Sequence, residues 1–252
     1  MRRIALSRLI VLALLGIGLS GCAAISPNPA GTLQLSEHQL ARAPELEPLR
    51  FQPLQGTLEE ILAEHGVDRA LGFSREVITV QGNPAITSLG EGGDLLAVLV
   101  TAAQGQPEQT VRLLRGDKPI FEAPAGLPSP ALPLQGLWAY DEHWALEILF
   151  SDQSTWAGKV FIDGELVNGL KRYDEAFGLQ LLAGRPFHFY LRNGHVGYSY
   201  NGQETELDYD EVPHYRCCGE SVLNPVQSQR MVAFFALREK AWFYIELGAF
   251  DR

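Results

Sequence analysis

Alternating apolar residues interrupted by Asn-Gly pairs, between residues 186 and 207, constrain the fold more than any other feature of the sequence. Asn193-Gly194 separates Phe187–Leu191 from Val196–Tyr200, and Asn201-Gly202 follows. Asn and Gly both tolerate the positive φ angles that a two-residue hairpin turn requires. Alternating side chains joined by such turns are typical of antiparallel strands. The segment therefore predicts a β-meander.

Similar arrangements of short strands and turns recur along the chain, near residues 83–123, 132–169, 179–207 and 231–248. The last of these contains only two strands. Such units are typical of propeller-like blades, and we expect an N-terminal strand such as Val77–Val80 to complete the last one. The competing interpretation is a β-sandwich in which similar hairpins recur by chance. In both cases the expected fold is mainly β, built from antiparallel meanders.

The segment before these units differs in composition. Residues 22–53 are rich in Pro, Ala, Ser and Glu and show little periodicity, which is typical of a tether. Thr57 and Glu60 then have the spacing of a capping box, and Gly66 follows as a stop signal. We expect a short helix at this point and a single β-rich domain over residues 54–252.

The first residues have the layout of a secretory signal. A basic start is followed by the apolar run Leu9–Leu19, which is too short to span a bilayer. The run ends in Leu19-Ser20-Gly21-Cys22, which resembles the lipobox of bacterial lipoprotein precursors. This resemblance covers about the first 22 residues. It implies that residues 1–21 are a signal peptide and that Cys22 becomes an N-terminus carrying fatty acyl chains such as palmitate.

The same resemblance implies a location. Two or three acyl chains hold a protein at a bilayer without a spanning helix, so the membrane is the first expected partner. The protein would lie outside the cytoplasm, in the cell envelope. Ala23 rather than Asp follows Cys22. In Gram-negative lipoproteins this favours the outer membrane, and in a cell with one membrane the anchor would lie on its outer face.

The charge of the chain excludes one class of partner. The formal net charge is −10, and removal of the signal peptide would take away three arginines and no acid. An acidic surface repels phosphate backbones and anionic headgroups. We therefore expect no binding to nucleic acid.

The cysteines that remain after Cys22 are adjacent, at Cys217 and Cys218. Successive Cα atoms lie ~3.8 Å apart, below the ~4.4–6.8 Å usual for a disulfide. The alternatives are a strained vicinal disulfide, two buried thiols or an intermolecular bridge. Adjacent cysteines are also poor zinc spacing, and the histidines form no ligand motif. We expect neither a metal nor a cofactor.

The loop over residues 208–225 is long for a β-connection and rich in aromatic and polar groups, as functional loops often are. Together with the segment around residue 140 it forms the candidate binding face, whose residues are Trp138, Tyr140, Asp141, His143, Trp144, Tyr209, Asp210, His214 and Tyr215.

The tripeptide Tyr-Asp-Glu begins at Tyr140, Tyr173 and Tyr209. Acidic loops with aromatic faces suit sugars, cations or basic peptides. Alternatively, each Asp starts a turn while its Tyr packs at a strand end.

No nucleophile elbow, phosphate loop or dinucleotide motif is present, and no residue is assigned a catalytic role. We expect a lipid-anchored envelope protein whose β-domain binds a ligand or a protein without catalysis. The alternative is an envelope enzyme that acts on glycans through paired carboxylates, which would require two carboxylates ~5–10 Å apart in one cleft. A purely structural envelope protein is a third possibility.

The lipid anchor can be tested directly. Replacing Cys22 with Ser removes the thiol that would carry the acyl chains, so the variant should be released from membranes. The measurement is its distribution between membrane and soluble fractions. Full retention in the membrane fraction would contradict the anchor.

Overall fold

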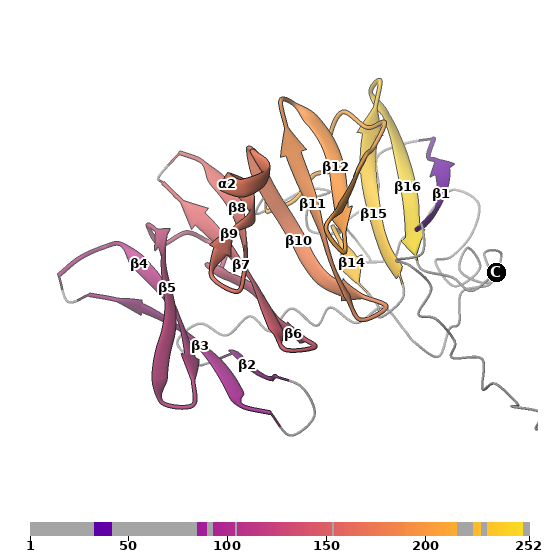
Figure 1. Cartoon of the computed structure of the whole chain (residues 1–252). Coiled ribbons are helices and arrows are strands. Elements are labelled where there is room, and N and C mark those ends of the chain that lie inside the picture. Colours follow the sequence, from indigo (N-terminus) through magenta and orange to yellow (C-terminus); the bar gives the residue numbers. More distant parts are fainter. Residues whose placement is uncertain are drawn as a thin grey trace, which may run out of the picture. The chain divides into compact units, whose positions relative to one another are not determined.

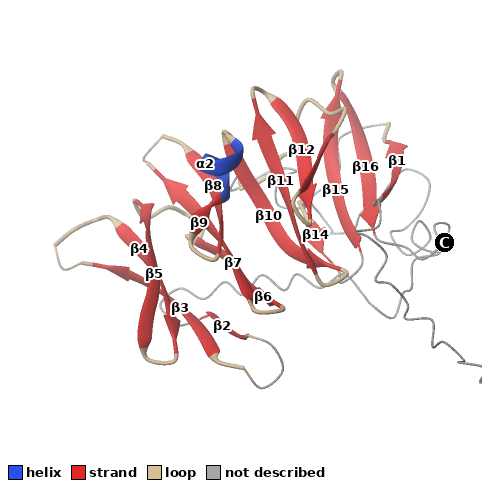
Figure 2. Cartoon of the chain, viewed as in Figure 1, coloured by secondary structure: helices blue, strands red, loops and turns tan. Residues whose placement is uncertain are grey.

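A computed structural model describes residues 33–41, 85–89, 93–103, 105–152, 154–215, 224–227 and 231–248. This part is mainly β, with antiparallel sheets and one short helix, α2 (Val167–Lys171) (Figure 2). Four expected features lie outside the described residues: the lipobox with Cys22, the helix near Thr57, the strand Val77–Val80 and the Cys217-Cys218 pair. Within the described residues, none of the helices has the length and apolar character needed to cross a membrane.

The strands form four successive meanders, which we call the first to fourth units (Figure 1). The first unit contains β2 (Ala85–Ser88), β3 (Leu95–Ala102), β4 (Gln109–Arg115) and β5 (Lys118–Gly126). The second contains β6 (Leu134–Tyr140), β7 (His143–Ser151), β8 (Trp156–Ile162) and β9 (Glu165–Leu166). The third contains β10 (Glu175–Leu182), β11 (Arg185–Arg192), β12 (His195–Tyr200) and β13 (Gln203–Glu206). The fourth contains β14 (Val226–Gln227), β15 (Met231–Arg238), β16 (Ala241–Gly248) and β1 (Gln34–Gln39).

The first two units share one sheet because β5 and β7 meet in a parallel pair at Gly126 and Ser151. All other strand pairs are antiparallel, and the third and fourth units are separate sheets. The recurrent meanders expected from the sequence are therefore confirmed.

The hairpin turns have the backbone geometry that the Asn-Gly pairs predict. Asn193 and Gly194 have φ angles of 52° and 78°, and Asn201 and Gly202 have 49° and 78°. These are the left-handed values of a two-residue turn. Strands β10 to β13 consequently pair in sequence, each with the next.

Several inner strands are buried on both faces. All residues from Pro186 to Tyr190 of β11 are buried, and so are those from Trp144 to Leu149 of β7 and from Met231 to Ala236 of β15. A sheet of a two-layer sandwich buries only alternate residues. These strands are instead covered on both sides, as blades in a stack are.

A core cluster fills the space between each successive pair of units. Leu113 of the first unit packs in one cluster with Leu146 and Ile148 of the second. Val160 of the second unit shares a cluster with Tyr190 of the third. Phe189 of the third unit packs with Phe234 of the fourth. Phe189 and Tyr190 are adjacent and serve opposite faces, because neighbouring side chains of a strand alternate.

The fourth unit is completed by the N-terminal strand β1, which pairs with β16 from Gln34 opposite Gly248 to Gln39 opposite Phe243. Glu37 accepts hydrogen bonds from both Arg238 terminal nitrogens, at 3.2 and 3.0 Å, and from the Tyr209 hydroxyl. The Arg238 guanidinium holds the pKa of Glu37 below its usual value. Residues that the sequence assigned to the tether thus supply a strand of the β-domain.

A buried carboxyl group joins the second unit to the third. Strand β10 has a register shift between Phe177 and Gln180. There Glu147 of β7 accepts hydrogen bonds from the backbone N–H groups of Gly178, at 3.1 Å, and Leu179, at 2.6 Å. At this irregular part of the strand, the Glu147 side chain thus supplies acceptors for two backbone N–H groups. Burial raises the pKa of Glu147 to about 8.

Glu147 predicts a distinctive dependence of stability on pH. Between pH 4.5, the ordinary pKa of a glutamic acid side chain, and about pH 8 the folded protein holds this proton and the unfolded chain does not. The free energy of unfolding therefore falls as the pH rises, by up to ~1.4 kcal/mol per pH unit from this group. The contribution is fully present below pH 4.5 and is lost toward pH 8. Urea unfolding between pH 6.5 and 8 should show this fall.

His188 provides a matched control. Burial lowers the pKa of His188 from 6.5 to about 4. Its titration therefore makes the free energy of unfolding rise with pH, and only between pH 4 and 6.5. The Glu147→Gln variant should be less stable, because glutamine has one acceptor oxygen and can accept only one of the two backbone N–H groups. It should also flatten the fall in stability above pH 6.5, because the titrating group is gone. His188→Phe should leave that slope unchanged. Equal slopes in wild type and Glu147→Gln would contradict the assignment.

Candidate functional site

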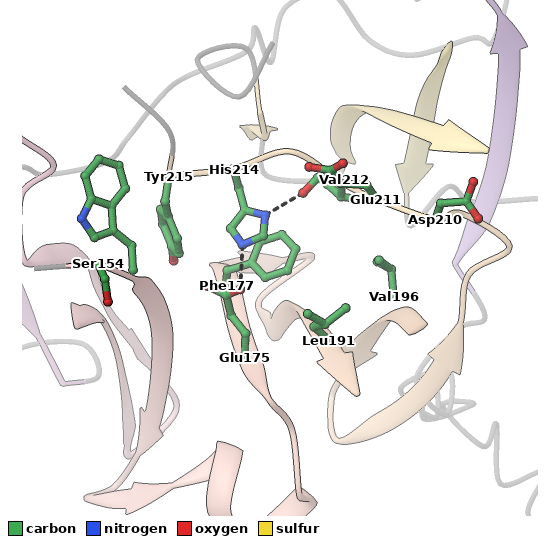
Figure 3. A pocket seen from close by; sticks show the side chains of 11 residues that line it. Ser154, Glu175, Phe177, Leu191, Val196, Asp210, Glu211, Val212, His214 and Tyr215 are labelled. Atoms are coloured by element: carbon green, nitrogen blue, oxygen red, sulfur yellow. Dashed lines mark hydrogen bonds and ion pairs between the residues drawn. The ribbon is translucent and has the colours of Figure 1, made fainter. Parts of the chain in front are cut away.

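A cavity of about 690 Å³ lies where the segment after β13 meets strands β8 and β10 (Figure 3). Its volume is typical of ligand pockets, which measure roughly 300–1,000 Å³. Among the described residues, those that line it are Ser154, Trp156, Glu175, Phe177, Leu191, Val196, Asp210, Glu211, Val212, His214 and Tyr215.

His214 is held from three sides. Its Nδ1 lies 2.6 Å from the backbone oxygen of Val212, and its Nε2 lies 3.2 Å from Oε2 of Glu175. The ring stacks on Phe177, with centroids 3.4 Å apart and planes within 2° (Figure 3). Both polar partners offer acceptor oxygens, so this arrangement suits a His214 ring that donates from both nitrogens.

Glu175 uses both of its oxygens. Oε2 faces His214, and Oε1 accepts a hydrogen bond from the Gly158 backbone N–H at 2.7 Å. The side chains of His214 and Glu175 are only 16% and 14% exposed. A buried ion pair seldom adds stability over apolar packing, because desolvation offsets the attraction. Its presence in a cavity wall therefore favours a functional role.

Tyr215 forms another part of the wall and depends on Gly158. A Cβ atom at Gly158 would lie 2.9 Å from Cε2 of Tyr215 and 2.3 Å from the backbone oxygen of Ala176. Only glycine leaves room for both neighbours. Tyr215 has a φ of 55°, which turns its ring toward β8. Its hydroxyl is buried there and has no hydrogen-bond partner in the described part of the chain.

Asn224 fixes the segment that carries His214 and Tyr215. Its buried side-chain amide donates to the backbone oxygens of Pro213, at 2.9 Å, and Phe235, at 2.8 Å. Its oxygen accepts the Phe235 backbone N–H at 2.7 Å. Three bonds from one side chain thus tie this segment to β15.

Two copies of Tyr-Asp-Glu have the same structural role. Asp174 accepts the Asn193 N–H at 2.7 Å, and Asp210 accepts the Glu239 N–H at 2.7 Å. Each Asp thereby stabilises a hairpin turn of its own unit, which fits the turn-forming interpretation. The tyrosines that precede them, Tyr173 and Tyr209, are buried. The equivalent glutamates, Glu175 and Glu211, both line the cavity.

The structure separates the candidate residues into two groups. Asp210, His214 and Tyr215 line the cavity, whereas Tyr209 is buried and donates to Glu37. The five candidates from the β6–β7 hairpin are not among the described residues that line this cavity. Trp138 donates to the Leu179 backbone oxygen, and the Trp144 ring packs against Phe121. The Tyr140 ring lies tilted against the His143 ring, with centroids 5.5 Å apart. Asp141 pairs with Arg185, and His143 pairs with Asp163.

Sequence reasoning did not select Trp156, Phe177 or Glu175 as site residues. Glu175 belongs to a Tyr-Asp-Glu copy, so its equivalence to Glu211 was a usable signal. Trp156 and Phe177 lie in ordinary strand sequences, and no local pattern distinguishes them from core residues.

The described residues contain no group of three or more His, Cys, Asp or Glu side chains placed to hold a metal ion. Comparison of the whole sequence with known families and with curated proteins found no matching family model and no significant relative.

The pairing of His214 can be tested with Glu175→Gln. The Gln oxygen can still accept the Gly158 N–H, but its NH₂ group then faces Nε2 of His214, which must accept instead of donate. ¹⁵N NMR of the imidazole at neutral pH should show two protonated nitrogens in wild type and one in the variant. The exposed control Glu206→Gln should leave the His214 signals unchanged. Two protonated nitrogens in Glu175→Gln would overturn the assigned pairing.

Proposed function

We propose that this chain is an exported protein, anchored in the cell envelope by lipid on Cys22, whose β-domain binds a ligand without catalysis. The ligand site is the cavity beside His214. Ligand pockets combine apolar and aromatic walls with a few convergent polar groups. Trp156, Phe177 and Tyr215 supply the aromatic walls, and His214 and Glu175 supply the polar pair.

The observation that carries the proposal is the largely buried His214–Glu175 pair in the wall of a ligand-sized cavity. In general, a buried ion pair can be replaced by well-packed apolar side chains at little cost in stability. A role in recognition gives a reason for keeping the pair there. The surrounding bonds to Gly158 and Val212 hold both side chains in a fixed orientation, which suits a preformed site.

A specific observation also supports the enzyme alternative, an envelope enzyme that acts on glycans. Glu175 and Glu211 line the same cavity, as paired catalytic carboxylates would. However, both oxygens of Glu175 already accept hydrogen bonds, from Gly158 and His214. A nucleophile or general acid needs an oxygen that faces the substrate. Binding is therefore the better-supported function.

The proposed anchor determines where the ligand would be met. Lipid on Cys22 would hold the domain at the outer membrane of a Gram-negative cell, or at the outer face of a single membrane. The candidate partners are then an envelope protein or an envelope glycan. The overall charge of −10 disfavours nucleic acid and other polyanions.

Photocrosslinking in intact envelopes tests this proposal. A benzoylphenylalanine placed at Trp156 reports on the cavity, and the same group at Tyr140, an aromatic residue outside the cavity lining, is the matched control. We expect a captured species at residue 156 and a much weaker one at residue 140, with mass analysis separating protein from glycan. Equal capture at both positions, or none at residue 156, would contradict the cavity as the ligand site.

A further inference from the structure

We infer that Asn168 of α2 is a positioning residue of the cavity, which acts on the His214–Glu175 pair through the backbone of β8. The inference rests on the proposed function and adds a residue on which ligand binding depends. Asn168 is not among the described residues that line the cavity, so its effect on a ligand must be transmitted. A short series of hydrogen bonds connects it to His214.

The series begins at the edge of β8, which is completed partly by side chains. Strand β7 pairs with one edge of β8 along its whole length, and β9 pairs with the other edge at Phe161 and Ile162. Asn168 accepts a hydrogen bond from the Val160 backbone N–H and donates one to the Gly158 backbone oxygen, both at 3.0 Å. A side-chain amide offers the donor and the acceptor of a peptide group, so Asn168 continues the ladder that β9 begins.

Asn168 is itself held in place. Helix α2 follows β9 directly and lies against β8 (Figure 1). Asn168 is 9% exposed, and its backbone oxygen accepts the N–H groups of Arg172 and Tyr173, the latter at 2.9 Å. Arg172 has a left-handed φ of 58°, which ends the helix before β10 begins. Bonds to its backbone and to its side chain together fix the amide group of Asn168.

Gly158 transmits the position of Asn168 to the cavity wall. Its backbone oxygen accepts from Asn168, and its N–H donates to Oε1 of Glu175 at 2.7 Å. The rigid peptide planes on the two sides of a residue share its Cα atom, so fixing one plane limits the other. The second oxygen of Glu175 lies 3.2 Å from Nε2 of His214. Loss of the Asn168 bonds would therefore loosen the Glu175 carboxylate and its contact with His214.

The Tyr215 ring gives a second route from the same glycine to the cavity. A Cβ atom at Gly158 would lie 2.9 Å from Cε2 and 3.0 Å from the hydroxyl oxygen of Tyr215, so the ring is in close contact with this backbone. A shift of β8 at Gly158 displaces Tyr215 as well as Glu175. Side chains that contact a ligand keep a productive geometry only where other bonds hold them, and Asn168 supplies such bonds here.

The Asn168→Ala variant tests the inference on the full chain. Alanine removes both side-chain bonds to β8 and keeps a backbone that favours α2. We expect the Nε2 signal of His214 to shift in ¹⁵N NMR of the purified protein. Capture by benzoylphenylalanine at residue 156 in intact envelopes should fall about fivefold, as for the loss of about one hydrogen bond of support.

Val98→Ala is the matched control for stability. Val98 is fully buried in the cluster between the first and second units, so its truncation weakens the fold without removing a bond of Asn168 or Gly158. Urea unfolding compares the stability of the two variants. The control should leave the His214 signal and the capture at residue 156 unchanged. Equal losses of capture in both variants would show a purely structural role for Asn168 and would overturn the inference.

A reciprocal measurement leaves Asn168 intact and so does not depend on the folding of the alanine variant. Glu175→Gln replaces the charged acceptor of the Gly158 N–H with a neutral one. The signals of the Gly158 amide and the Asn168 side-chain amide should both shift in ¹H–¹⁵N spectra, and the exposed control Glu206→Gln should shift neither. An unchanged Asn168 signal in Glu175→Gln would contradict the transmission.

The outcomes separate this inference from the proposed function. Unchanged His214 signals in Asn168→Ala, or a shift of these signals without loss of capture, would overturn the positioning role and leave the cavity as the ligand site. Absence of capture at residue 156 in the chain with no other substitution would overturn the proposed function itself.

Discussion

The burial of both faces of each inner sheet is the constraint on which the rest of the structure depends. Phe189 packs toward the fourth unit and Tyr190, its neighbour, toward the second. A strand between two other units must therefore satisfy two different apolar surfaces at once, which explains why β7 and β11 are largely apolar. Sheets stacked in this way use apolar contacts between units in place of a single central core.

Polar groups between the sheets are tolerated where they form specific bonds, and these bonds build the cavity. Glu147 bridges β7 to the irregular part of β10. Asn168 of α2 accepts the Val160 N–H and donates to the Gly158 oxygen, while Glu175 accepts the Gly158 N–H. The cavity thus lies beside positions where buried side chains replace regular ladder bonds. The bond from Gly158 to Glu175 also fixes the orientation of a side chain in the cavity wall.

The sequence predicted the parts of the fold that depend on local chemistry. Asn193-Gly194 and Asn201-Gly202 require positive φ at turns, so the third unit was readable residue by residue. The strand that completes the fourth unit could not be recognised in the sequence. Its sequence, Gln34–Gln39, is polar and half-exposed, and its position is fixed by the distant partners Arg238 and Tyr209. An edge strand with one solvated face carries little apolar periodicity, so it resembles a tether in the sequence.

The candidate site divides in the same way. The sequence alone indicated a long polar and aromatic connection over residues 208–225, and on that basis Asp210, His214 and Tyr215 were chosen as candidates. That His214 meets Glu175, and that Trp156 lies in the same wall, follows from how the sheets pack on one another. The physical reason is that turn and strand preferences act between neighbours in the chain, whereas the packing of one sheet on another joins residues whose separation in sequence leaves no local pattern.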